Sequence, residues 1–335
     1  MMKPFKVSVL DLAPVKQGET INSTFKASLE LAQHVEKLGY ERFWLAEHHN
    51  MPNIASSATV VLIGYIANGT TKIRVGSGGV MLPNHSSLVV AEQFGTLDAL
   101  FPNRIDLGVG RAPGTDGLTA QALGRDPSTI NEKFPRQILE VQKYFSVENA
   151  RSKVRAFPGE GSHVPIYVLG SSTDSAWLAS ELGLPYAFAG HFAPDQMEYA
   201  FHIYKENFRP SRYLDQPYTI ACVNAIAAEN DAKANFIATT LFQGFVNLIR
   251  DQRQPYAPPV EDMDEIWNPM EKAHVLRMLR YTFIGSKDTI KESLQSFQER
   301  FDVDEYMFST MVYSHADRLK SYEIMKQVQE ELCSI

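Results

Sequence analysis

Strand-like and helix-like segments alternate along nearly the whole chain of 335 residues. Short runs rich in β-branched and aromatic residues predict strands, whereas runs with apolar residues every three or four positions predict amphipathic helices. Eight strands alternating with helices favour an α/β fold of the TIM (β/α)8 barrel type over an open doubly wound sheet, which normally uses fewer strands. The predicted strands cover residues 5–10, 42–46, 73–80, 104–109, 165–169, 186–189, 218–227 and 305–309.

One segment late in the chain interrupts this alternation. Residues 252–269 are rich in proline and acidic side chains, which is typical of a loop, and we place an inserted loop at about 252–285. Nothing marks a linker, so we predict a single domain over residues 1–335, a TIM barrel with an insertion late in the barrel. The predicted helices cover residues 21–38, 55–67, 86–101, 130–145, 174–182, 194–208, 231–250, 287–300 and 316–332.

Composition argues against several classes of protein. The formal net charge of -7 argues against a broad nucleic-acid surface, and the longest apolar stretch, residues 58–67, is too short to cross a bilayer. Asp11 interrupts the apolar run near the N-terminus, so no signal peptide is expected. Two cysteines, Cys222 and Cys333, are too few for a disulfide framework and suit a reducing compartment. We therefore expect a soluble, cytoplasmic protein with a small-molecule substrate.

Residues 43–49 combine a short apolar strand with three ionisable side chains at its carboxyl end, Glu47, His48 and His49. In a parallel α/β protein this edge is where ligands bind. In an extended segment Glu47 and His49 share one face and His48 points to the other, so the three side chains are poorly placed to bind one metal ion. We infer that one histidine acts alone, by transferring a proton or by bonding a ligand. The alternative is that the cluster caps the strand and pairs with local arginines.

Residues 76–79, Gly-Ser-Gly-Gly, place three glycines inside a predicted strand. Glycine weakens a strand interior, where it usually marks a bulge or the close approach of a ligand. A flat ring lying against the backbone would need the space that Gly78 and Gly79 leave free. A packing bulge without a ligand is the open alternative.

Two further strand ends carry groups that suit anions. Arg111 follows the strand at 104–109, and its guanidinium offers paired donors to a phosphate or carboxylate. The glycines around it are spaced GxGxxxG and not GxGxxG, so a dinucleotide site is weakly supported. Gly170, Ser171 and Ser172 lie between a strand and a helix, where hydroxyl and backbone N–H groups bind anions, although N-capping alone would explain the serines. A phosphate bound at these two strand ends and a flat ring against Gly78 and Gly79 would together form a phosphorylated aromatic cofactor. FMN fits that description.

Four motifs form a stronger signal together than each does alone. They are Trp-Leu-Ala-Glu-His-His at 44–49, Val-Gly-Ser-Gly-Gly-Val-Met-Leu-Pro at 75–83, Arg-Ile-Asp-Leu-Gly-Val-Gly-Arg at 104–111, and Ala-Trp at 176–177 before Gly-Leu-Pro at 183–185. Over nearly its whole length the chain resembles the bacterial luciferase-like flavin monooxygenase family. The resemblance implies a TIM barrel, reduced FMN that reacts with O2, or the deazaflavin F420 in one branch. It also implies a homodimer and a separate NAD(P)H-dependent flavin reductase.

The same resemblance assigns roles to individual residues. His48 falls at the family's catalytic histidine, which promotes proton transfer, and Gly78–Gly79 matches a cis peptide that supports the flavin ring. Gly110 stands where light-emitting relatives carry a reactive cysteine, and a Gly-Gly pair replaces their Ala-Ala pair, so bioluminescence is not expected. The resemblance matches Arg111, Ser171 and Ser172 to phosphate-binding positions. We predict no metal site and a cofactor site formed by Ala46, Gly78, Gly79, Arg111, Gly170, Ser171, Ser172 and His191, although a lone histidine such as His191 is more often structural.

The leading hypothesis is a two-component monooxygenase that oxidises a small organic substrate with reduced FMN and O2. The same fold could instead carry an F420-dependent dehydrogenase, in which hydride transfer replaces O2 chemistry, or a non-catalytic flavin-binding protein. A metal-dependent hydrolase could use His48, His49, His85 or His191, but the HxH pair expected at the end of the first strand is missing.

Overall fold

The computed structural model describes residues 3–112, 114–126, 128 and 130–334. The strands in this part of the chain are β1 (Lys6–Asp11), β2 (Arg42–Leu45), β3 (Arg74–Met81), β4 (Ile105–Gly110), β5 (Ile166–Gly170), β6 (Tyr186–Ala189), β7 (Thr219–Ala227), β8 (Phe283–Gly285) and β9 (Glu305–Ser309). All but β8 pair in parallel around a closed ring, in the order β1-β2-β3-β4-β5-β6-β7-β9 and back to β1. This closed barrel confirms the predicted fold.

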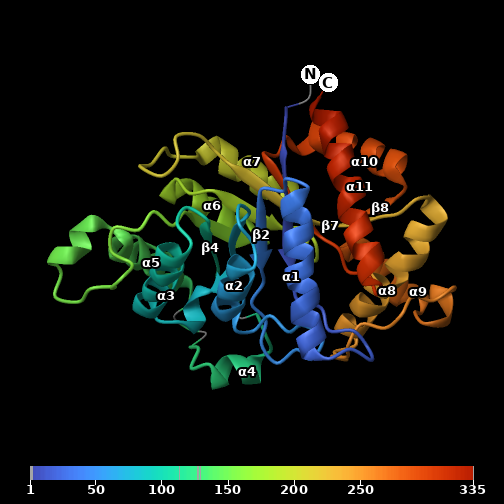
Figure 1. The fold of residues 1–335 in the computed structure, drawn as a ribbon, viewed down its shortest axis with the longest axis horizontal. Coiled ribbons are helices and arrows are strands. Elements are labelled where there is room, and N and C mark those ends of the chain that lie inside the picture. The colour runs from blue at the N-terminus through green and yellow to red at the C-terminus, as the bar shows by residue number, and fades with distance from the viewer. Residues whose placement is uncertain (1–2, 113, 127, 129, 335) are drawn as a thin grey trace.

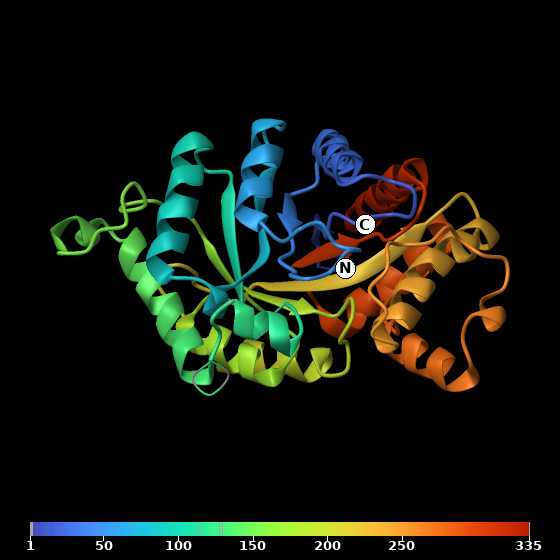
Figure 2. The ribbon, with the colours of Figure 1, turned by 90° about the horizontal axis from the view of Figure 1, so that it is seen from below.

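Helices cover the outside of the barrel (Figures 1 and 2). The two ends of the chain lie side by side (Figure 1). Gln329 Nε2, on the last helix, donates to the carbonyl of Phe5, near the N-terminus, at 3.0 Å. No helix in the described ranges is long and apolar enough to span a membrane. The helices are α1 (Ile21–Lys37), α2 (Thr59–Asn68), α3 (Ser87–Leu100), α4 (Gly117–Ala122), α5 (Ile130–Phe145), α6 (Thr173–Leu182), α7 (Met197–Asn207), α8 (Asp231–Ile249), α9 (Pro269–Met278), α10 (Lys287–Phe301) and α11 (His315–Cys333), with short 3-10 turns η1 (Leu82–Asn84), η2 (Val147–Arg151) and η3 (Met263–Glu265).

The segment predicted as a loop at about 252–285 is an insertion, but much of it is regular structure. It contains η3, α9 and β8, and β8 extends the sheet beyond the barrel by pairing with the last residues of β7. Pro269 starts α9 instead of ending a segment, since Asn268 and Glu271 form a capping box around it and proline is well tolerated at a first helical position. The short helix α4 was also not predicted.

Other element boundaries shift by a few residues. Helix α2 begins at Thr59 and not at 55, and α7 begins at Met197 and not at 194. Gly39 follows α1 with φ +77°, as the predicted helix end requires. Ser86 is the N-cap of α3, although its side chain makes no capping hydrogen bond.

Side chains alternate between two cores along each strand. In β2, Phe43 and Leu45 pack outward against the helices, whereas Trp44 points into the barrel beside Leu10 and Ala46. This alternation explains why residues on one strand serve either packing or the site.

The amino-terminal half of the barrel interior holds a buried charge network. Arg42 Nε donates to Glu305 at 2.8 Å and Arg42 Nη1 donates to Asp106 at 2.8 Å, and both carboxylates are fully buried. Burial alone would lower the pKa of Arg42, but the two carboxylates raise it well above its ordinary value. Trp44 Nε1 also donates to Asp106, at 3.0 Å, and Tyr218 donates to Glu305 at 2.7 Å. Each charge therefore has a partner, as burial requires.

Candidate functional site

The carboxyl ends of the parallel strands meet on the face of the barrel that carries α4 (Figure 2). The loops that leave these ends contact one another: His49 N donates to the Gly114 carbonyl at 3.0 Å, which joins the segments after β2 and β4. Residues that are far apart in the sequence are thereby brought to one edge, as the fold predicts.

Glu47 is a buried carboxylate that joins the segments after β2 and β3. Its Oε1 lies 3.0 Å from His49 Nε2 and 2.9 Å from His85 Nε2, and its Oε2 accepts from Met81 N at 3.2 Å. Burial raises the pKa of Glu47, but the hydrogen bonds from the two histidines and the backbone outweigh burial and leave the pKa below its usual value. The ionised Glu47 carboxylate therefore bonds to His49 and His85, whereas the alternative interpretation paired the cluster with arginines. His48 lies outside this cluster.

His48 and His191 form a second group at the same edge. Nδ1 of each ring is buried and has no hydrogen-bond partner within the described residues, although part of each side chain remains accessible. Burial lowers the pKa of His48, and burial together with the neighbouring His48 lowers the pKa of His191 to about 3. Both imidazoles are therefore neutral near pH 7, and each ring is partly accessible at this edge of the barrel.

The glycine pair in β3 has the geometry that the resemblance named. The Gly78–Gly79 peptide is cis, and the β3–β4 register shifts at the same place. A Cβ on Gly78 would lie 2.7 Å from Leu10 Cδ1, and one on Gly79 would lie 2.7 Å from the Gly108 carbonyl oxygen. The register shift agrees with the bulge interpretation, and a Cβ at either position would force neighbouring atoms to move, backbone atoms in the case of Gly79.

Arg111, directly after β4, points toward the first turn of α6. Its Nη1 and Nη2 each lie 3.3 Å from Asp174 Oδ2, and the Asp174 side chain is 70% exposed. An ion pair this exposed contributes little, so an anionic ligand can compete for the guanidinium. Ser172 is the N-cap of α6, but its side chain makes no capping hydrogen bond, so capping does not account for this serine. Ser171 precedes it.

Ala46 and Gly170 have local roles. The Ala46 carbonyl accepts hydrogen bonds from Ser56 Oγ and, at 2.9 Å, from Thr59 Oγ1, and this fixes the segment that carries His48. A Cβ on Gly170 would collide with the Ser175 side chain, so this glycine also satisfies packing.

The first part of the insertion lies across this face. Tyr256 N donates to the Val15 carbonyl at 2.9 Å, beyond β1. Arg253 Nη1 donates to the Asn50 carbonyl at 3.0 Å and to Asp116 Oδ2 at 2.8 Å. The insertion thus joins the segments that follow β1, β2 and β4.

Comparison with known proteins identifies the family. A family profile described as luciferase-like monooxygenase matches residues 5–303. The chain belongs to this family. YvbT of Bacillus subtilis (strain 168) is 53% identical over 323 residues, 96% of each chain. A luciferase-like monooxygenase of Escherichia coli (strain K12) is 48% identical over 330 residues, 98% of each chain. The N-acetyl-S-alkylcysteine monooxygenase of Bacillus subtilis (strain 168) is 30% identical over 327 residues, 96% of this chain and 97% of the relative.

Solved structures agree with the fold of this luciferase-like monooxygenase. Apo-MsnO8 is 31% identical with a TM-score of 0.86, over 97% of this chain and 98% of that chain. Two more distant structures cover the same shares. The oxygenating constituent of 3,6-diketocamphane monooxygenase from Pseudomonas putida, in complex with FMN, has a TM-score of 0.70 at 16% identity. An F420-dependent secondary alcohol dehydrogenase, in complex with an F420-acetone adduct, has a TM-score of 0.69 at 14% identity. These last two show the fold alone.

Three contacts at this site were not predicted from the sequence. Asp174 pairs with Arg111, His85 bonds to Glu47, and Arg125 joins two loops. The Arg125 guanidinium donates to Asn84 Oδ1 at 2.8 Å and to the Arg111 carbonyl, and it thereby fixes the segments after β3 and β4. No local motif marks these pairs, because the partners come from different loops.

The metal-dependent alternative lacks a set of donors. Across the described ranges, no three His, Cys, Asp or Glu side chains are grouped to hold a metal ion. The histidines named for a hydrolase are divided between the Glu47 cluster, with His49 and His85, and the separate pair of His48 and His191.

Proposed function

We propose that this luciferase-like monooxygenase is a two-component enzyme that uses reduced FMN and O2 to oxidise a small organic substrate. The observation that carries the proposal is the pair of neutral imidazoles, His48 and His191, at the same barrel edge as Arg111 and the start of α6. Neutral, partly accessible imidazoles suit a polar, flat ligand, and a guanidinium beside a helix N-terminus suits its phosphate.

The residues present fit FMN. Arg111, Ser171, Ser172 and Gly170 would hold the phosphate at the start of α6, and Ala46 with the Gly78–Gly79 peptide would lie against the ring. Reduced FMN supplies two electrons for O2, so that one oxygen atom enters the substrate and the other leaves as water. His48 would move the proton that this chemistry requires, and His191 would bond the cofactor.

An F420-dependent dehydrogenase is the second candidate, because a dehydrogenase of that kind shares the fold. FMN is favoured because the relatives at 30% and 48% identity are both named monooxygenases. The name of the first relative makes thioethers of the N-acetyl-S-alkylcysteine class the first substrates to test.

Exchange of Arg111 for glutamine tests the phosphate assignment. We expect the wild type to bind reduced FMN more tightly than reduced riboflavin, which lacks the phosphate. Arg111→Gln should remove that preference by weakening FMN binding about tenfold or more, since bonds to charged groups contribute about 1.5–3 kcal/mol. Anaerobic titration measures both affinities. The exposed Arg277→Gln exchange on α9 is the control, and an undiminished FMN preference in Arg111→Gln would contradict the assignment.

Two further parts of the proposal concern the source of reduced FMN and the cellular compartment. A separate NAD(P)H-dependent reductase would provide the reduced FMN, because the GxGxxxG spacing of Gly108, Gly110 and Gly114 does not match a dinucleotide site. Pro113, within that motif, lies outside the described residues. Turnover of the reconstituted system that depends on an added reductase would support this.

The free thiols of Cys222 and Cys333 favour the cytoplasm, which cell fractionation would test.

We also propose a homodimer through α2 and α3. Val61 and Tyr65 on α2 and Val89 on α3 are exposed apolar or aromatic side chains, and Val61 is 71% exposed. Burying such a surface against a second copy removes it from water. Val61→Glu should therefore shift the protein toward monomer in sedimentation analysis, whereas Leu276→Glu on the distant α9 should not. A monomeric wild type would refute the dimer.

A further inference from the structure

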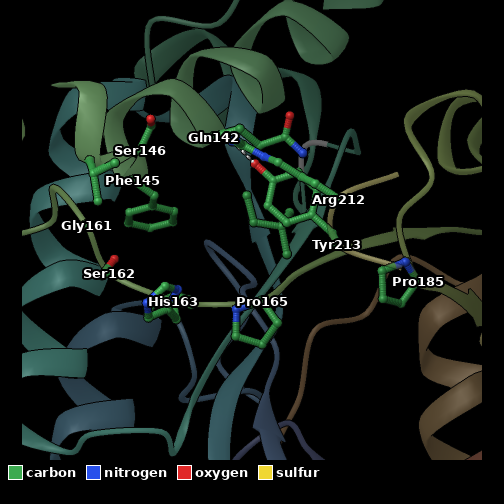
Figure 3. Close-up of a pocket in the computed structure, with 13 residues that line it drawn as sticks. Gln142, Phe145, Ser146, Gly161, Ser162, His163, Pro165, Pro185, Arg212 and Tyr213 are labelled. Carbon is green, nitrogen blue, oxygen red and sulfur yellow. Dashed lines mark hydrogen bonds between the residues drawn. The ribbon is translucent and has the colours of Figure 1, made fainter. Parts of the chain in front are cut away.

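A cavity at the opposite end of the barrel has the size of a small-molecule site. Its volume is about 450 Å³, and it lies beside the amino ends of β5 and β6 (Figure 3). Ligand pockets commonly measure about 300–1,000 Å³. Because the strands separate this cavity from the carboxyl-terminal face, its occupant would not be the substrate of the proposed reaction.

The walls of the cavity suit a flat apolar group. Phe145, at the end of α5, lies on one side and Tyr213, in the segment before β7, on another, with Pro165 below them and Pro185 beyond Tyr213 (Figure 3). Phe145 is largely buried, so its ring is held by the protein. Aromatic rings and prolines offer large contact areas with few rotatable bonds, which favours a rigid aromatic ligand.

The polar groups of the cavity favour an anion. Arg212 donates to the Tyr213 hydroxyl, and its guanidinium lies 4.7 Å from the centre of the Tyr213 ring, so the cation and the ring lie together at the exposed rim of the cavity. His163 also lines the cavity. Ser162 Oγ is buried without a partner in the part of the chain that the structure describes.

The absence of acidic side chains strengthens this inference. Among the described residues no Asp or Glu lines the cavity, although Asp and Glu outnumber Lys and Arg by 39 to 32 in the whole chain. We propose that this cavity binds a small aromatic carboxylate, with its carboxylate at Arg212 and its ring against Phe145 and Tyr213. The site is independent of the flavin chemistry proposed above.

Binding of 1-naphthoate to the full-length protein tests the proposal, with the neutral analogue 1-naphthamide as its matched control. Calorimetric titration should show that naphthoate binds at least about tenfold more tightly than naphthamide, the effect expected for a charge-assisted hydrogen bond. Arg212→Gln should weaken naphthoate binding by a similar factor and leave naphthamide unchanged. Phe145→Leu should weaken both compounds, because it removes ring contact and not charge.

Two control variants locate the binding. Arg151→Gln removes a nearby exposed arginine that does not line the cavity, and it should leave naphthoate affinity unchanged. Arg111→Gln, on the catalytic face, should also have no effect. The proposal would be overturned if naphthoate failed to bind, if both compounds bound equally, or if Arg111→Gln weakened binding while Arg212→Gln did not.

Discussion

Replacing His48 with alanine is expected to slow substrate oxidation by about 10²–10⁴-fold, the range for losing a positioned general acid or base. Burial lowers the pKa of the His48 imidazole, which is therefore neutral near pH 7, and part of the side chain remains accessible to a cofactor or substrate. The exchange leaves the hydrogen bonds of Glu47 to His49 and His85 intact, so the loop should keep its shape. Product formation at saturating reduced FMN, with a thioether substrate, is the measurement.

The control for this experiment is His274→Ala, which removes an exposed histidine on α9. It should leave product formation and reduced-FMN affinity unchanged, whereas His48→Ala should lower product formation by a much larger factor than it lowers that affinity. Wild-type turnover in His48→Ala would refute the catalytic role of His48.

Replacing Arg42 with methionine is expected to reduce the free energy of unfolding by about 3–5 kcal/mol, the cost of breaking a buried ion pair from one side. The exchange leaves Glu305 buried in the barrel without a cation, whereas Asp106 keeps its ion pair with Arg74. The methionine side chain has a similar volume, so the loss of packing is a minor contribution. Urea unfolding measures the change.

Arg136→Met is the matched control for this stability measurement. Arg136 also pairs with a carboxylate, that of Glu140 one helical turn away, but its side chain is 80% exposed. Its loss should change stability by less than about 1 kcal/mol, since exposed pairs contribute little. Equal effects of the two exchanges would show that the interior network does not stabilise the barrel.

The barrel was predictable because its signals are local. Strand and helix patterns can each be recognised within a stretch of about a dozen residues. The bounds predicted for α5 and β9 agree with the structure. The helix α9 was missed because Pro269 suggested a loop, whereas a capping box from Asn268 and Glu271 makes that proline a helix start.

Contacts between distant segments were not predictable. Arg42, Asp106 and Glu305 begin or nearly begin their strands, where a charge is unremarkable, and only closure of the barrel brings them together. The exposed pair of Arg111 with Asp174 likewise joins two different loops.

The candidate site shows the same division between local and distant information. The placement of Glu47 with His49, and of His48 apart from them, follows from the alternation of an extended segment. The neutrality of His48 and His191 depends on burial by several elements at once, which a single sequence does not show.

The central claim is that this protein binds reduced FMN and uses it with O2. Anaerobic titration with reduced FMN and, in parallel, reduced F420, followed by mixing with aerated buffer while absorption is recorded, tests it most directly. We expect tight binding of reduced FMN and a transient absorption band before oxidised FMN appears. Preference for F420 without reaction with O2 would contradict the claim in favour of a dehydrogenase, and FMN binding without the transient band would indicate a non-catalytic flavin-binding protein.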